Sequence, residues 1–466
     1  MTESVLEISV ETWLAEDFGP VEEQVTVAEL GITVGSYCAT KVEDLRAHSV
    51  RNTVRVSAML LATWLLDNYW RLRWEPVRDL KAKTGTWFDW QLSHSLPSIG
   101  GGYVWPPLTI SSDGENLWLA STPSSEEEPS NIAPVRYLNS FSMFVAAAEF
   151  ENAIAKFIDT VIARLDSRGH TDTVLHKLWK DTLHERKQTK LGLARRLEAL
   201  LGLDPDEESS LISELTKHWE PRVGREALSE IAAASAPTKI RQVLDATEKA
   251  ATSQKTFADL SSLASVRASL QQSWFFGPQA PWLSAREAAY KLRELWGLGS
   301  GVLTTADIAA HLSIPVHLLN EVNQDLPFAV GVQGPQEYKL SFVLNRHREQ
   351  SRRFDIARLL GDQLAVEAKD VWRPATKSFT VRQKFQRAFA AELLCPSEEL
   401  VKNLPSPLDL ETVDDIVEGV ADKYQVSERL VLSHLVNRGL APEFLLDEAN
   451  SSLLNGVLQR RLLQSD

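Results

Sequence analysis

The feature that most constrains the fold is a long helical pattern in the middle of the chain, from about residue 136 to residue 275. Two segments there, FSMFVAAAEFENAIAKFIDTVIARLDS and HTDTVLHKLWKDTLHERKQTKLGLARRLEALLGL, place apolar side chains at the spacing of amphipathic helices. A chain of 466 residues is also too long for one ordinary core, so two or three domains are expected. We therefore predict a helical middle domain, residues 136–279, between two domains of different character.

The N-terminal domain, residues 1–135, is predicted to mix helices and strands and is rich in tryptophan. Val54–Trp74 has apolar residues at helical spacing, which predicts a buried helix. Asp113 and Gly114 separate two short apolar runs, which is typical of a β-hairpin. The tryptophans indicate either large core side chains or an aromatic recognition face.

The C-terminal domain, residues 280–466, is predicted to surround one β-hairpin with helices. Pro327–Asn345 contains two β-rich runs around a Gly-Pro break, which predicts the hairpin. Arg352–Leu364, RRFDIARLLGDQL, follows as a helix, and a loop is expected at VWRPATKS before the helix FTVRQKFQRAFAAELLCP. Two further helices are joined at YQVS. The predicted fold class is therefore mainly α with small β elements, that is, α+β.

Charge and composition exclude several classes of protein. The formal net charge is -14 and the pI is near 5.3, which argues against a bulk nucleic-acid coat protein because phosphate neutralisation needs an excess of Lys and Arg. No apolar run approaches the roughly 20 residues of a membrane helix, and the acidic N-terminus does not resemble a signal peptide. Cys38 and Cys395 have no Cys or His partner at ligand spacing. We expect a cytoplasmic protein with reduced thiols and no membrane contact.

The order of motifs from residue 280 to about residue 450 resembles the ImmA/IrrE family of zinc metallopeptidase-like domains. The match consists of a helix REAAYKLRELWGL, a short helix, a hairpin ending in VLN, a helix entered through RRFDIA, the phrase RAFAAELLCP and a helical pair around V-S-x-x-x-L. The resemblance implies a zincin-like fold for this domain. The central helix retains the family frame at Arg352, Arg353, Phe354, Ala357 and Gly361.

The positions that would carry the chemistry differ from the family pattern. In the family, two histidines four residues apart bind zinc, and a glutamate after the first serves as general base. Here these positions are Arg358, Asp362 and Leu359, and the candidates for the third, acidic ligand are Gln383 and Phe385. A cation and a hydrocarbon provide neither a metal ligand nor a base. Arg358 and Asp362, one helical turn apart, are instead expected to pair with each other.

These departures predict a pseudoenzyme with no catalytic residue, metal or other cofactor. In this interpretation the domain binds a protein partner or senses a ligand, and the cleft between hairpin and central helix accepts an extended segment by strand addition. The resemblance implies a role in bacterial stress responses, toxin–antitoxin pairs or phage defence. The candidate binding residues are Arg358, for a carboxylate of the incoming segment, with Asp362, Asn345, Phe342 and Arg353.

Two alternative functions stay open at this point. The first is a metallopeptidase with a relocated metal site, for which Asp355, Asp362 and Glu392 are the candidate ligands. The second is a nucleic-acid-associated defence effector that uses the locally basic stretch Arg164–Arg196 together with the aromatic N-terminal domain. That stretch also contains acidic residues, so a solvated helix is the preferred interpretation of its charges.

Overall fold

The computed structural model describes residues 5–14, 16, 19–77, 85–124, 134–270, 281–365, 370–402, 413–438 and 440. In these residues the chain is mostly helical with several small antiparallel sheets, which confirms the expected α+β class. The chain divides into two compact units, Met1–Ile212 and Ser213–Asp466. The boundary falls inside the long helical pattern, so helices of that segment occur in both units. Among the described residues, no helix is long and apolar enough to cross a lipid bilayer.

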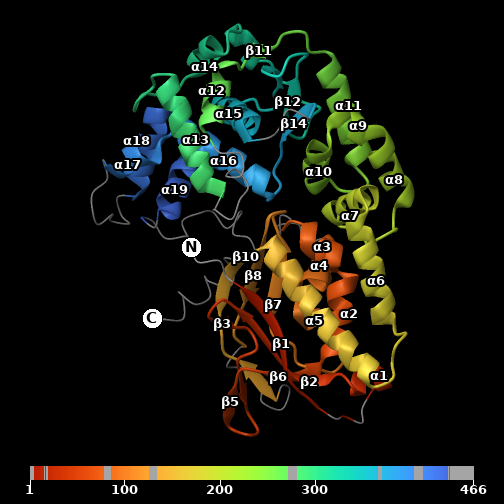
Figure 1. The fold of residues 1–466 in the computed structure, drawn as a ribbon. Helices are drawn as coiled ribbons and strands as arrows, with labels where there is room; N and C mark the ends of the chain where they lie inside the picture. The colour runs from red at the N-terminus through yellow and green to blue at the C-terminus, as the bar shows by residue number, and fades with distance from the viewer. Residues whose placement is uncertain are drawn as a thin grey trace. The chain divides into compact units, whose positions relative to one another are not determined.

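Small antiparallel sheets form the β part of the first unit (Figure 1). In the largest, β2 pairs with β1, β3 and β6, and the others have the orders β10-β8-β7 and β5-β4-β9. The hairpin predicted around Asp113 and Gly114 is confirmed as β7 and β8. The strands are β1 (Leu6–Trp13), β2 (Val27–Val34), β3 (Tyr37–Cys38), β4 (Val42–Asp44), β5 (Ser49–Arg51), β6 (Val54–Ser57), β7 (Leu108–Ser112), β8 (Asn116–Ser121), β9 (Val135–Tyr137) and β10 (Phe141–Ala146).

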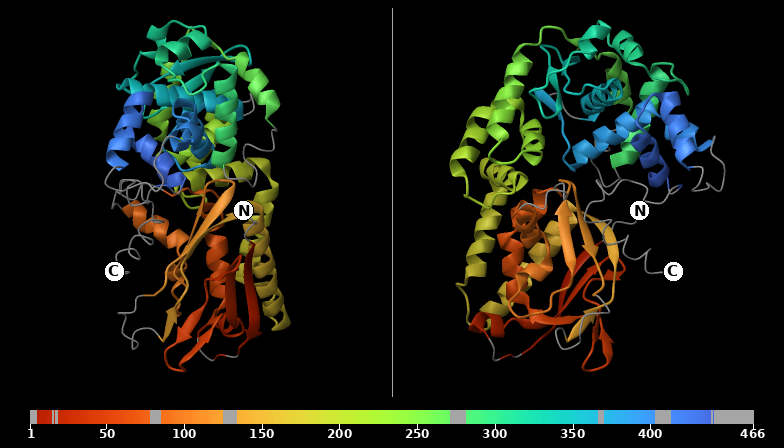
Figure 2. Two further views of the ribbon diagram at one scale, coloured as in Figure 1. Left: turned by 90° about the vertical axis from the view of Figure 1, so that its left-hand side faces the viewer. Right: turned by 180° about the vertical axis from the view of Figure 1, so that it is seen from behind.

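The helix predicted over Val54–Trp74 is only partly correct. Its first residues form β6, because Val54 and Val56 fit a buried face beside β2. Ser57 then begins the helix by accepting a hydrogen bond from Leu60 N at 3.3 Å, and a break at Asn68 separates α2 from α3. Helices α5 and α6 pack beside α2, and Figure 2 shows this group of helices from two further sides. The helices are α1 (Val21–Gln24), α2 (Ala58–Asp67), α3 (Tyr69–Trp74), α4 (Gly85–His94), η1 (Leu96–Ile99), α5 (Ala147–Ser167), α6 (Val174–Lys187), α7 (Thr189–Leu201) and α8 (Ser209–Glu214), which crosses the unit boundary.

One sheet with the order β11-β13-β12-β14 organises the second unit. The predicted hairpin is confirmed as β12 (Ala329–Gln333) and β13 (Lys339–Val343), and β11 (Ala258–Asp259) pairs with β13. The loop expected at VWRPATKS is wrong, because β14 (Trp372–Ala375) pairs with β12. Pro374 hid this strand from the sequence pattern, yet an edge strand tolerates a residue without a backbone N–H.

Helix α15 (Glu349–Ala365) lies in the core of the second unit, against α16 (Val381–Leu394) and the sheet (Figure 1). A Cβ added at Gly361 would lie 2.7 Å from the ring of Phe389, so glycine permits the close approach of α15 and α16. The remaining helices are η2 (Leu215–Trp219), α9 (Glu220–Val223), α10 (Arg225–Ala233), α11 (Ile240–Thr252), α12 (Ser262–Ser269), α13 (Pro281–Leu295), α14 (Thr305–His311), η4 (Val316–Leu319), α17 (Ser397–Lys402), α18 (Val413–Tyr424) and α19 (Glu428–Asn437).

Candidate functional site at helix α15

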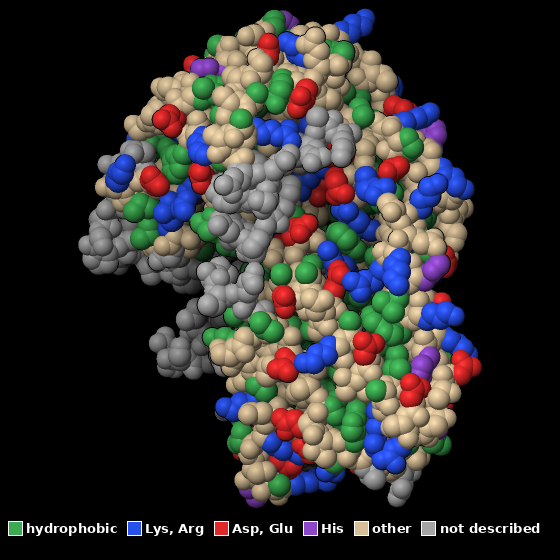
Figure 3. All heavy atoms as spheres, in the orientation of Figure 1, with side chains coloured by type: hydrophobic (Ala, Val, Ile, Leu, Met, Phe, Trp, Pro, Cys, Tyr) green, Lys and Arg blue, Asp and Glu red, His purple; other side chains and the backbone are tan. Residues whose placement is uncertain are grey.

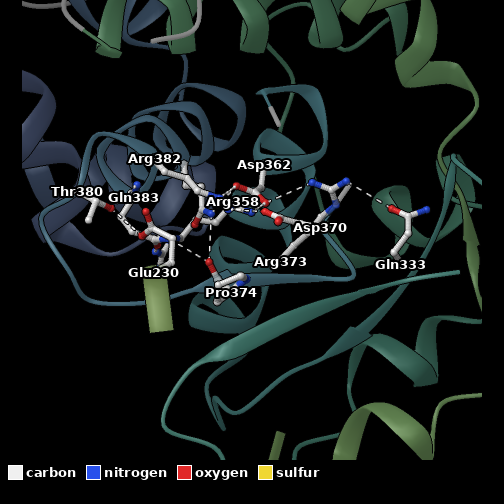
Figure 4. A network of polar contacts seen from close by, with 11 residues as sticks. Glu230, Gln333, Arg358, Asp362, Asp370, Arg373, Pro374, Thr380, Arg382 and Gln383 are labelled. Atoms are coloured by element: carbon white, nitrogen blue, oxygen red, sulfur yellow. Dashed lines mark hydrogen bonds and ion pairs between the residues drawn. The ribbon is translucent and has the colours of Figure 1, made fainter. Parts of the chain in front are cut away.

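The three positions that would hold the metal and the general base lie on α15 and are buried. Arg358 is 5% exposed, and Leu359 and Asp362 are fully inaccessible. Leu359 packs in the main hydrophobic cluster of the unit. Arg358 and Asp362 belong instead to a network of charged and polar side chains between α15, α16, β14 and α10, which we call the α15 network (Figure 4).

Asp362 is held by a bidentate ion pair with Arg382 of α16. The Nε and Nη2 atoms of Arg382 each donate to one carboxylate oxygen of Asp362 at 2.7 Å, and its Nη1 donates to Asp370 at 2.8 Å. Gln386 donates to Asp362 at 2.8 Å, and Arg373 Nη1 lies 3.5 Å from it. Burial disfavours the charged carboxylate, but the charge and hydrogen bonds of Arg382 outweigh burial and lower the pKa of Asp362.

Arg358 does not form the expected direct pair with Asp362. Its Nη atoms donate to the carbonyls of Ala375, at 3.2 Å, and Thr376, at 2.6 Å, and to Gln383 Oε1 at 2.5 Å. Its nearest carboxylate is Asp355, three residues earlier, at 3.6 Å. Oppositely charged residues four apart usually pair on an exposed helix, but Arg358 and Asp362 do not, because each of them forms hydrogen bonds with buried partners from β14 or α16.

Helix α10 closes the other side of the network through Glu230. Thr380 and Ser378 donate to its carboxylate at 2.7 and 3.4 Å. Complete burial raises the pKa of Glu230, against the opposing charge of Arg382. Burial also raises the pKa of Asp355 and Asp370, whereas at Asp362 the charge and hydrogen bonds of Arg382 outweigh burial and lower the pKa.

Residues of α9 and α16 contact the strand β14, which lies at the edge of the sheet, and the residue before it. Val371 N donates to Val223 O at 3.0 Å, and the carbonyl of Pro374 accepts from Gln383 and Gln386 at 3.0 and 3.2 Å. A Cβ at Gly224 would meet Asp370 Oδ1 at 2.3 Å, so the end of α9 lies tightly against the strand. In the hairpin, β12 is flanked by β13 and β14, and β13 pairs with β11 at Lys339 and Leu340. At these positions the strand edges on which strand addition would depend are occupied by the chain itself.

The other predicted binding residues do not meet at an open surface. Arg353 is buried and donates to the carbonyls of Tyr424 and Gln425, where α18 ends. Phe342 belongs to the hydrophobic cluster. Asn345 Nδ2 donates to Leu326 O at 3.1 Å and stabilises the chain around the hairpin.

The candidate ligands of a relocated metal site are committed to separate partners. Asp355 lies near Arg358 and Arg346, and Asp362 belongs to Arg382. Glu392 accepts from the backbone and hydroxyl of Ser397 at 2.9 and 2.7 Å. Within the described part of the chain, no group of three or more His, Cys, Asp or Glu is placed to hold a metal ion.

Sequence reasoning missed Arg373, Arg382, Gln386 and Glu230. Arg382 and Gln386 are one helical turn apart in the very stretch where the family pattern calls for an acidic ligand. Both side chains recur at helical spacing with Phe385 and Phe389, so they share one face of α16 with large apolar residues, and this was the available signal for a buried partner on the facing helix. Nothing local marks Glu230, since 150 residues separate it from Thr380.

Comparisons with known proteins do not assign a function to this site. The chain matches no family model, and neither a curated protein nor a solved structure shows significant similarity to it.

Proposed function

We propose that the second unit is a non-catalytic ImmA/IrrE-like domain and that the chain acts as a protein-binding or sensing module. The pathway proposed for it is a bacterial stress-response, toxin–antitoxin or phage-defence pathway. The observation that carries the proposal is the bidentate Arg382–Asp362 pair, buried at the position where the resemblance places a zinc ligand. The guanidinium group of Arg382 binds both carboxylate oxygens of Asp362, which are the atoms that a metal ion would need as ligands.

The charge balance of the α15 network supports the same conclusion. Arg358, Arg373 and Arg382 face Asp355, Asp362 and Asp370, and each arginine keeps a cation in place permanently. Binding a divalent cation there would require at least one of these pairs to break in a buried environment, which costs several kcal/mol. In this proposal α15 serves as a core element of the domain.

The partner contact of this proposal uses residues other than Arg358, because that side chain is buried and its Nη atoms are bound within the chain. The basic stretch Arg164–Arg196 gives the nucleic-acid alternative little support. Arg195 is paired with Glu185, Glu198 and Asp206, and Arg186 with Glu151.

Metal analysis of the purified full chain tests the catalytic half of the proposal. We expect far less than one zinc per chain after incubation with zinc and desalting, and no cleavage of an unfolded protein substrate that a chelator abolishes. One tightly held zinc per chain that is lost in Asp362→Ala would overturn it. The binding half predicts that the tagged chain, expressed in its native cell, elutes with a stoichiometric protein or small-molecule companion. Elution with the mass of the bare chain under all stress conditions would contradict it.

A further inference from the structure

A hollow on the first unit is formed by helices α5 and α6 alone. Its volume is about 640 Å³, which lies in the range of roughly 300–1,000 Å³ that is typical of small-molecule sites. Figure 3 shows Lys, Arg and His side chains interspersed with Asp and Glu on the right-hand side of the molecule, over α6. None of the residues that line the hollow belongs to the α15 network.

The floor of the hollow is apolar. Ile162 from α5 and Trp179 and Leu183 from α6 line it. Trp179 is buried, and its Nε1 donates to Asp159 at 2.9 Å, which fixes the plane of the indole ring. A rigid apolar floor on a surface helix favours a ligand with an aromatic or aliphatic body.

The rim of the hollow carries two lysines. Lys180 and Lys187 lie on one face of α6, with His184 between them, and the Nε2 atom of His184 lies 2.7 Å from the side-chain amide nitrogen of Gln188. Among the described residues, neither Lys180 nor Lys187 has a carboxylate at ion-pair distance. Nearby cations of the same helix are neutralised, since Lys177 pairs with Asp172 at 3.5 Å and Arg186 with Glu151 at 2.5 Å.

The remaining lining residues limit the charge of the ligand. His176 also lines the hollow. Its two ring nitrogens already interact with Thr173, at 2.9 Å, and with Asp166, at 3.2 Å, so we do not assign them to the ligand. Asp181 contributes one negative charge to the lining. Two lysines against one aspartate suit a small anion and do not suit a polyanion such as nucleic acid.

We propose that this hollow binds a small organic anion, with its apolar body on Ile162, Trp179 and Leu183 and its phosphate or carboxylate head at Lys180 and Lys187. The inference stands independently of the function proposed for the second unit, because every lining residue lies in the first unit. It assigns a ligand-binding role to the first unit.

Isothermal titration of the full chain with four probes tests this inference. Adenosine 5′-monophosphate and hexanoate carry an apolar body with a phosphate or a carboxylate head, whereas adenosine and inorganic phosphate each lack one of the two parts. We expect at least one of the first two to bind, and adenosine and inorganic phosphate to bind at least tenfold more weakly. Which of the two anions binds identifies the head group.

Matched variants locate the binding. Lys180→Gln combined with Lys187→Gln should weaken the binding anion about tenfold. The control, Lys177→Gln with Lys190→Gln, removes the same charge from exposed positions of α6 and α7 outside the hollow and should leave the affinity within twofold. All four lysines are exposed, and circular dichroism verifies that both variants fold. The absence of binding by every probe, equal binding of adenosine, or equal losses in the two variants would overturn the inference.

Discussion

The α15 network and the hollow on α6 place charged side chains on helices in opposite ways. In the network, Arg382 is 5% exposed and three of its nitrogens bind carboxylates of the same chain. In the hollow, Lys180 and Lys187 are exposed, and no described carboxylate neutralises them. A charge that is satisfied internally serves the fold, whereas a charge left to solvent remains available to a ligand.

The sequence predicted neither the burial of the first region nor the hollow in the second. The motif that resembles an active site lies in the buried α15 network, and the two exposed lysines lie on a helix that the sequence predicts to be solvated. Removing a charge should therefore cost much stability in the network and little in the hollow. Stability measurements on single variants test this contrast.

The largest effect is expected for Arg382→Met. The change leaves Asp362 and Asp370 buried without their main cation, which should lower the free energy of unfolding by about 3–5 kcal/mol. Urea unfolding measures the loss, and faster hydrogen exchange in peptides from α15 and α16 assigns it to the network.

Arg241→Met is the matched control for that change. Arg241 Nε donates to Glu214 at 2.7 Å, the same distance as in the buried pair, but the two side chains are 52% and 37% exposed. The control should cost less than about 1 kcal/mol. Similar costs for both variants would show that burial does not distinguish the α15 network.

Two glycines inside helices give a second contrast, with opposite signs. Gly361→Ala forces a Cβ against the ring of Phe389 and should destabilise the second unit by about 1–3 kcal/mol, despite the better helix propensity of alanine. Gly192→Ala in α7 meets its nearest atom, Glu185 O, at an ordinary 3.5 Å and should stabilise by up to about 1 kcal/mol. Thermal unfolding compares the two, and stabilisation by Gly361→Ala would contradict the close packing of α15 on α16.

The sequence predicted the elements that are determined by local pattern. The helix at Arg352–Leu364 and the hairpins around Gly114 and Gly334 follow from periodicity and turn residues, and the structure has them. The strands at Val54 and Trp372 were missed, because a short strand is defined by its partner β2 or β12 and not by its own few residues.

The candidate site was predictable only in part, for the same reason. The sequence placed Arg358 and Asp362 on one helix, and that placement is correct. Their partners come from α16, β14 and α10, and no helical spacing encodes contacts between segments so far apart in sequence. An arginine and an aspartate one turn apart therefore suggested a surface pair, whereas burial gives each of them a different partner.

A buried histidine in the second unit gives another test of how burial affects a charged group, because the charge of a histidine can change with pH. His434 lies 3.8 Å from Glu392, and Arg438 donates to the neighbouring Ser397 at 2.7 Å. Burial lowers the pKa of His434 below its ordinary 6.5, against the opposing charge of Glu392. Below pH 6.5 the unfolded chain takes up a proton that the folded chain does not, so stability should fall by at most about 1.4 kcal/mol per pH unit as the pH decreases.

His434→Asn removes this titration and serves as the reference. Its free energy of unfolding, measured from pH 7.5 to pH 5, should change less steeply than that of the natural chain. Parallel curves would mean that His434 binds its proton equally in both states, and the buried position would then carry no electrostatic cost.

The smallest effect is expected for the hollow. Lys180→Gln with Lys187→Gln should change the free energy of unfolding by less than about 0.5 kcal/mol, because exposed charges without a partner contribute little to stability. Urea unfolding without ligand gives this value. A loss above about 1 kcal/mol would assign both lysines to the fold, as in the α15 network. A near-zero change together with a large loss of anion affinity would instead separate charges that stabilise the protein from charges that bind a ligand.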